Sequence, residues 1–154
     1  MLSGLMNLTD IEGGKNMKLA YDENLMKQSL DTMIFPGEES LCPVYCIIKE
    51  TGFFARPENL KSGFVSITNT GRFLIAEMYF SQRKRYSYGL AYINKLKCKK
   101  NIFGQYEINA TFLIDNKKHK ISLQMAKSVY GGKFPNQSQN VDRMLGILEK
   151  YITA

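Results

Sequence analysis

The sequence predicts a mainly β (α+β) domain: a bent antiparallel sheet or partly open barrel of about seven strands, with an extra helix before it and a capping helix after it. Three observations support this prediction. Short runs in which apolar and polar residues alternate follow one another between residues 43 and 125. Turn-forming residues separate these runs. Two amphipathic helical patterns, at 22–34 and 136–152, lie on either side of them.

The first sixteen residues differ from the rest of the chain. Residues 11–16, Ile-Glu-Gly-Gly-Lys-Asn, directly precede Met17. A purine-rich coding run for Glu-Gly-Gly would resemble a bacterial ribosome-binding sequence placed before a start codon. We therefore expect residues 1–16 to be a disordered or mis-annotated extension. Residues 17–154 are expected to form a single domain, and the source is expected to be bacterial.

The first helix is expected over 22–34. Asp22 is a suitable N-cap, and apolar residues recur on one side of the pattern, including Leu25, Met26 and Leu30. The Phe35-Pro-Gly-Glu38 segment ends the helix, because proline disfavours the helical conformation of the residue before it.

The strands follow in hairpin order. They are expected at 43–49, 64–67, 72–80, 86–93, 95–99, 106–112 and 121–125. In the turn at 68–71, Asn69 and Gly71 tolerate a positive φ. Further turns are expected at 81–85, which is polar and basic, at 101–104 and at 115–117.

The last element is a helix that begins near the capping candidates Asn136 and Ser138. Its apolar residues, from Val141 to Ile152, fall on one face. A helix of this length is marginal alone in water, so we expect it to cover one open end of the curved sheet.

The composition is that of a globular protein, with 44% hydrophobic and 23% charged residues, and the sequence contains no apolar run of 18 residues.

The three cysteines, Cys42, Cys46 and Cys98, form no CxxC pair, which favours buried free thiols in a reducing cytosol. The single histidine, His119, lies in a basic run and is expected to be exposed. One histidine excludes two-histidine zinc motifs and argues against a Ser/His/Asp triad.

Several short motifs resemble those of the bacterial pleckstrin-homology (PH)-like families, including the YokE-like group. The Phe35-Pro-Gly-Glu38 segment is similar to their opening before the first strand, and residues 63–75 are similar to their first hairpin, with Gly71 as an added residue. Ser87–Ile93 and Phe134–Gln137 are similar to a later strand and to the start of the closing helix. The resemblance covers residues 24–152 and implies a PH-like fold, a scaffold that hosts lipid, peptide and oligomer contacts alike.

Arg72 follows directly after the turn at 68–71. It could pair with Glu77 or another nearby carboxylate, or contact a ligand, and the structural role is the one we expect.

Two basic clusters are candidate contact sites. Arg83, Lys84 and Arg85 lie in the expected turn at 81–85 and could meet an anionic membrane; the alternative is a solvated turn. The second cluster could meet nucleic acid, or could instead protect a sheet edge from aggregation. It consists of Lys95, Lys97, Lys99, Lys117, Lys118 and Lys120.

No glycine-rich phosphate loop, HExxH or GxSxG motif occurs, so we expect no enzyme, catalytic residue, cofactor or metal. The function expected first is non-catalytic binding in the cytoplasm, by contact with an unknown protein or by self-association as a homo-oligomer. Tyr45, Tyr79 and Tyr106 on an outer sheet face are candidates for that contact. The alternatives are peripheral association with an anionic membrane and, more weakly, contact with nucleic acid.

Overall fold

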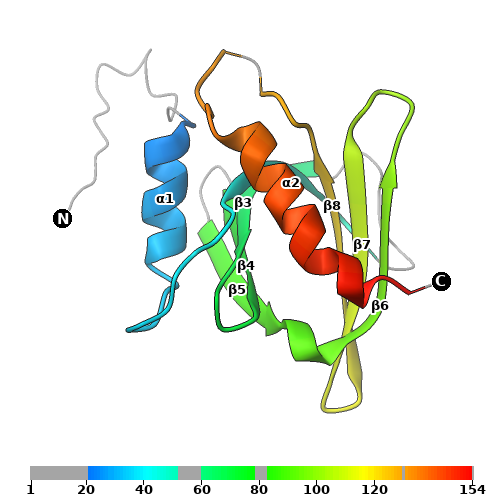
Figure 1. Ribbon diagram of the computed structural model, residues 1–154. Coiled ribbons are helices and arrows are strands. Elements are labelled where there is room, and N and C mark those ends of the chain that lie inside the picture. The colour runs from blue at the N-terminus through cyan, green and yellow to red at the C-terminus, as the bar shows by residue number, and fades with distance from the viewer. Residues whose placement is uncertain (1–20, 52–59, 79–82, 130, 154) are drawn as a thin grey trace.

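The computed structural model describes residues 21–51, 60–78, 83–129 and 131–153 (Figure 1). The expected extension at 1–16 lies outside these ranges. Within them, the chain forms one N-terminal helix, seven strands and one C-terminal helix.

The seven strands form one antiparallel sheet in the order β5-β4-β3-β2-β8-β7-β6. The strands are β2 (Val44–Lys49), β3 (Leu60–Ile67), β4 (Arg72–Met78), β5 (Arg83–Gly89), β6 (Ile93–Lys100), β7 (Tyr106–Ile114) and β8 (Lys117–Met125). A 3-10 helix, Leu90–Tyr92, leads from β5 to β6, the two edge strands. The sheet is therefore strongly bent but not closed.

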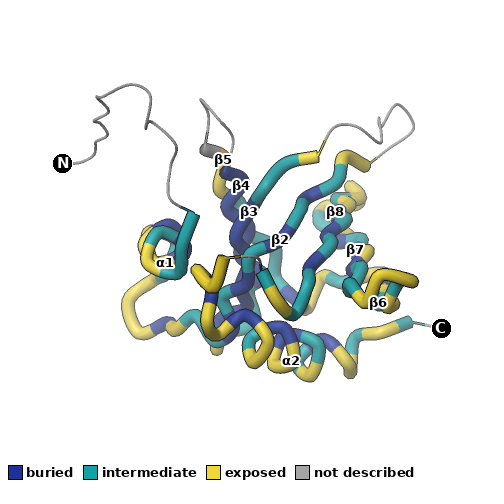
Figure 2. The backbone as a smooth tube through the Cα atoms, turned by 90° about the horizontal axis from the view of Figure 1, so that it is seen from above, coloured by how far each residue is buried: buried dark blue, intermediate teal, exposed yellow. Residues whose placement is uncertain are grey.

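Helix α2 (Gln137–Leu148) covers the inner, concave face of the sheet, as Figure 2 shows from above. Its Val141, Met144 and Leu148 are fully buried against inward residues of the strands. The largest of these inward residues are Phe73, Phe112, Ile67, Ile75, Ile108, Leu96, Leu123 and Met125. After α2 and a 3-10 turn, the backbone N–H of Thr153 donates to the carbonyl of Leu96 at 3.0 Å, which fixes the chain to edge strand β6.

Helix α1 (Glu23–Asp31) packs on the opposite, outer face, against β3 and β4. Met26 and Leu30 meet Phe64 and Leu74 in a second core cluster. Strands β3 and β4 are therefore buried on both faces, and their burial does not alternate. In β6, β7 and β8 neither of the described helices α1 and α2 lies on the outer side, and buried and exposed residues alternate as the sequence predicted.

The helix caps agree with the sequence in part. The Asp22 carboxylate accepts a hydrogen bond from the Leu25 N–H at 2.9 Å, as predicted. The side chain of Asn136 does not cap α2; its amide donates to Glu23 Oε1 at 2.9 Å and joins the starts of the two helices.

The expectation for the 68–71 turn was also partly wrong. Gly71 has a φ of +84°, whereas Asn69 has no positive φ and accepts the Glu39 N–H through its side chain. Asn69 therefore stabilises the turn by a hydrogen bond to a distant segment rather than by its conformation.

Candidate functional site

Arg72 is held by a dense set of contacts at the start of β4. Its guanidinium donates two hydrogen bonds to Glu38, from Nε to Oε2 at 2.9 Å and from Nη2 to Oε1 at 2.7 Å. It also donates to Ser87 Oγ at 2.9 Å and to the Met33 carbonyl at 2.7 Å. The ring of Phe35 lies 4.0 Å from the guanidinium carbon. Arg72 therefore joins the α1–β2 connection to β4 and β5.

Glu38 is the partner of Arg72, and Glu77 is not. The Glu38 side chain is only 2% exposed and also accepts hydrogen bonds from the Phe35 N–H and the Thr70 hydroxyl. The hydrogen bond with Arg72 holds the pKa of Glu38 well below its ordinary value of 4.5, and the same pair raises the pKa of Arg72. The guanidinium of Arg72 and the carboxylate of Glu38 are both occupied by contacts within the protein. The geometry therefore supports the expected structural role of Arg72.

The basic segment Arg83–Arg85 is not a turn, because β5 begins at Arg83. Arg83, Lys84 and Arg85 pair with Met78, Glu77 and Ala76 of β4. Since neighbouring residues of a strand point to opposite faces, Lys84 lies on the inner side with Glu77, whereas Arg85 lies on the outer side with Ala76. Lys84 and Arg85 therefore lie on opposite faces of the sheet.

The lysines of the second cluster do come together, on the outer side of the β8–β7–β6 half of the sheet. Cross-strand pairing places Lys95, Thr111 and Lys120 in one row, and Lys97, Asn109, Ser122 and Lys49 in the next. Lys99 shares a third row with Glu107, and Lys118 pairs with Leu113 beyond the first row. We call this surface the lysine face; it consists of Lys49, Lys95, Lys97, Lys99, Lys118 and Lys120.

One of the expected members does not belong to this face. Lys117 pairs with Ile114, a residue that packs against the inner core, so it points to the other side. Lys49, which the sequence analysis did not include, takes its place in the second row.

The lysine face is strongly unbalanced in charge. Glu107 is the only acidic residue of β2, β6, β7 and β8, and it lies 3.8 Å from both Lys49 and Lys99. Lys95, Lys97, Lys99, Lys118 and Lys120 are all exposed. Six lysines against one glutamate give the face a positive potential that attracts anionic partners.

A pair of apolar residues, Ile102 and Phe103, lies at the end of the β6–β7 hairpin next to this face. Their side chains are 92% and 80% exposed. The hairpin end is the yellow-green turn at the upper right of Figure 1, at the opposite end of these strands from the β7–β8 turn. The sequence predicted a turn here, but these two side chains were not among the candidate contact residues. Their residue types could have identified them, because the centre of a tight turn usually carries Gly, Pro, Asn, Asp or Ser rather than large apolar residues.

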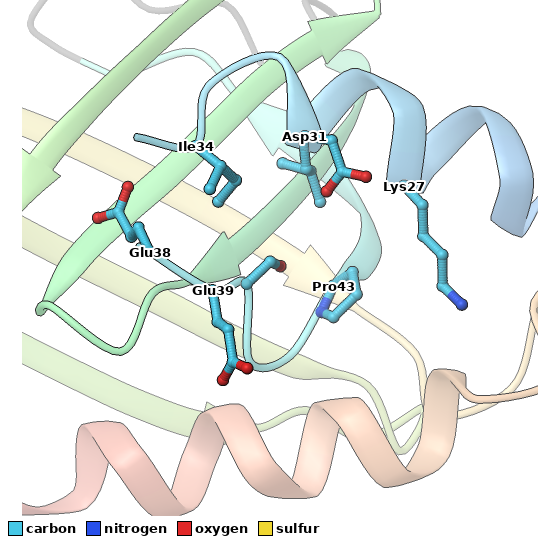
Figure 3. A pocket seen from close by; sticks show the side chains of 8 residues that line it. Lys27, Asp31, Ile34, Glu38, Glu39 and Pro43 are labelled. Atoms are coloured by element: carbon cyan, nitrogen blue, oxygen red, sulfur yellow. The ribbon is translucent and has the colours of Figure 1, made fainter. Parts of the chain in front are cut away.

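The largest of the described pockets, about 300 Å³, opens between α1 and the segment that follows it (Figure 3). Lys27 and Asp31 line it from α1, and Glu38, Glu39 and Pro43 line it from the connection to β2. Its one buried carboxylate, Glu38, is already bound by Arg72. Among the described residues, no group of His, Cys, Asp or Glu side chains could hold a metal ion.

A smaller pocket of about 200 Å³ lies at the end of the sheet where β2 and β8 separate. Lys61 donates to Glu77 at 3.2 Å inside it, and the Tyr86 hydroxyl donates to the other oxygen of Glu77 at 2.5 Å. Burial and the neighbouring Glu77 raise the pKa of Tyr86. The two hydrogen bonds stabilise this end of the sheet. Because its pKa is raised, the Tyr86 hydroxyl keeps its proton.

The cysteines and the histidine are structural. Cys42, Cys46 and Cys98 are free thiols, and burial raises the pKa of Cys42 to about 11 and that of Cys46 further. His119 is partly buried, not exposed as expected, because its ring lies 5.4 Å from that of Tyr88 on the inner side.

The tyrosines expected on an outer face are mostly packed. Tyr45 stacks on Phe134 with ring centroids 5.0 Å apart, under the second core cluster. Tyr106 packs against the inner core. Tyr79 lies outside the described residues.

No family model and no curated protein matches this sequence. Among solved structures, the chain is similar to the hSac2 domain from the human phosphoinositide phosphatase Sac2, with a TM-score of 0.50 and 11% sequence identity. The similarity covers 88% of this chain and 87% of the hSac2 chain. At this identity the likeness concerns the fold alone. It confirms the predicted fold class: a PH-like, mainly β domain with a bent, open seven-stranded sheet and a helix at each end.

Proposed function

We propose that this chain is a non-catalytic binding domain of the bacterial PH-like type, and that it associates peripherally with an anionic membrane surface through the lysine face. The observation that supports this proposal is the alignment of six lysines on one side of the sheet that no described helix covers, with Glu107 as the only acid on those strands. Each basic residue near an anionic bilayer contributes about 1 kcal/mol of attraction.

A bilayer suits this face better than nucleic acid does. Proteins that bind single strands combine basic residues with exposed aromatic platforms on which bases stack. The outward positions beside the lysines hold Asn109, Thr111, Leu113, Ser122 and Gln124, none of which is aromatic. The exposed Phe103 stands at the end of the β6–β7 hairpin, outside these rows. A lipid headgroup layer requires only positive charge at a flat surface.

No helix among the described residues is long and apolar enough to cross a membrane. The proposed association is therefore by surface contact. The anionic lipids are concentrated in the cytoplasmic leaflet, which is the surface that the proposal implies.

The test is co-sedimentation with anionic and neutral vesicles at low and moderate salt, using wild type and the variant Lys95→Glu/Lys97→Glu/Lys120→Glu. The matched control, Lys27→Glu/Lys133→Glu/Lys150→Glu, makes the same charge change at exposed positions away from the face. The face variant should bind anionic vesicles up to about 100-fold more weakly than wild type, because three lysines that contribute about 1 kcal/mol each supply about 3 kcal/mol together.

The control variant should lose much less affinity, and neutral vesicles should bind neither protein. Equal losses in the two variants would contradict the proposal. Tighter binding of a single-stranded oligonucleotide than of anionic vesicles would favour nucleic acid as the partner. Self-association remains a separate prediction, which light scattering in moderate salt would test.

A further inference from the structure

The turn between β6 and β7 is held by its own backbone and by one polar side chain. The Gly104 N–H donates to the Asn101 carbonyl at 3.0 Å, and the Asn101 N–H donates to the Gln105 carbonyl at 2.8 Å. The side-chain oxygen of Asn101 accepts from the N–H groups of Phe103 and Gln105 at 2.9 and 3.0 Å. Gly104 has a φ of +80°, as the last residue of such a turn requires.

The side chains of Ile102 and Phe103 contribute nothing to this arrangement. They stand at the two central positions of the turn and are 92% and 80% exposed. The β7–β8 turn at the other end of the same strands has Asp115 and Asn116 at its centre, both with positive φ. The apolar pair is therefore not a requirement of hairpin geometry, and exposing it to water is unfavourable.

Lysines border the apolar pair on the β6 side. Lys99 and Lys100 directly precede the turn, and Lys97 is the next outward residue of β6. No acidic residue occurs between Ile93 and Tyr106, and the next one, Glu107, lies 3.8 Å from Lys99. An apolar tip bordered by lysines is complementary to an anionic bilayer, which offers negative headgroups at its surface and an apolar layer beneath them.

We infer that the β6–β7 turn inserts Ile102 and Phe103 into the acyl boundary of an anionic bilayer, with Lys97, Lys99 and Lys100 at the level of the headgroups. This inference rests on the proposed function and adds the docking orientation. The sheet meets the membrane tip first, so Lys118 and Lys120, nearer the other end of the strands, stay above the headgroups and attract them at longer range.

The chain contains no tryptophan, so one introduced tryptophan reports its own surroundings without background. Phe103→Trp is the reporter. Tyr92→Trp is its control, because Tyr92 is also exposed and lies at the other end of β6. With anionic vesicles that contain brominated acyl chains, the fluorescence of the Phe103→Trp protein should shift to the blue and be quenched, and that of the Tyr92→Trp protein should show neither effect.

Two further comparisons test the orientation. Ile102→Ser/Phe103→Ser keeps every hydrogen bond of the turn and should weaken vesicle binding by about tenfold or more. Lys97→Glu/Lys99→Glu should weaken binding several-fold more than Lys118→Glu/Lys120→Glu does.

The outcomes separate this inference from the proposed function. Co-sedimentation of the Phe103→Trp protein without a spectral shift or quenching would overturn the insertion and leave electrostatic binding in place. Equal quenching at positions 92 and 103, or equal losses in the two lysine variants, would overturn the tip-first orientation. No co-sedimentation of wild type with anionic vesicles would overturn the proposed function and the insertion together.

Discussion

Replacing Arg72 by leucine should destabilise the whole domain, because it leaves the Glu38 carboxylate buried without its cation. Arg72 supplies two hydrogen bonds to Glu38 and one each to Ser87 and the Met33 carbonyl. In the variant, Glu38 keeps only its bonds from Phe35 and Thr70. A buried carboxylate without a cation must either take up a proton or be reached by water through local opening of the structure. Each of these changes costs free energy.

The expected size of the effect follows from burial. Breaking a buried ion pair by removing one partner costs about 3–5 kcal/mol. The Glu38 side chain is 2% exposed but that of Arg72 is 20% exposed, so water can reach part of the vacated space and the lower end of the range applies, about 3 kcal/mol. For a chain of this size, that loss lowers Tm by roughly 6–12 °C.

Urea unfolding followed by circular dichroism measures the change in unfolding free energy. The matched control is Lys127→Ala, which removes an exposed pair with Asp142 at 2.9 Å and should cost less than about 1 kcal/mol. The double variant Arg72→Leu/Glu38→Gln should lose less than the sum of its single changes, since the buried charge is gone. A loss below about 1 kcal/mol for Arg72→Leu would refute the structural role assigned to this arginine.

Three further predictions concern stability. The pKa of Glu38 in the folded protein lies below its ordinary value of 4.5, so the contribution of this carboxylate to the unfolding free energy is complete above that pH and is lost as pH falls. The difference in unfolding free energy between wild type and Glu38→Gln should therefore shrink below about pH 4.5. Gln137→Ala should cost about 1–3 kcal/mol in urea unfolding, because the buried Gln137 amide bonds both the N–H and the carbonyl of Tyr45. Gly63→Ala should lower Tm and cost about 1–3 kcal/mol, because its new Cβ would overlap the Ile48 side chain; an unchanged Tm would contradict this close packing.

Much of the fold followed from local patterns in the sequence. Alternation gave β6 and β7 nearly to their ends, because one side of each strand is core and the other is water. It gave β8 only from residue 121, although the strand begins at Lys117, because the basic run at its start shows no apolar alternation. The start of β5 was wrong because Arg83–Arg85 has the composition of a turn. Edge strands tolerate such charge, and only the pairing with β4 shows that this segment is extended.

The candidate sites depended on contacts that are distant in sequence. Glu77 is the carboxylate nearest to Arg72 along the strand, but Lys61 and Tyr86 occupy it, and the true partner lies 34 residues earlier. The lysine face was largely predictable, because alternation already placed Lys95, Lys97 and Lys99 on one side. Only the register of β7, β8 and β2 shows that Lys117 faces inward and that Lys49 belongs to the lysine face.

The most direct test of the membrane proposal is amide hydrogen exchange of the wild-type protein with and without anionic vesicles. This measurement locates the docked surface without any substitution. Tip-first docking predicts that exchange slows at residues 97–105, most strongly around the β6–β7 turn, and is unchanged in α1. Slowed exchange centred on α1 or on β5, with no change at the β6–β7 turn, would contradict it.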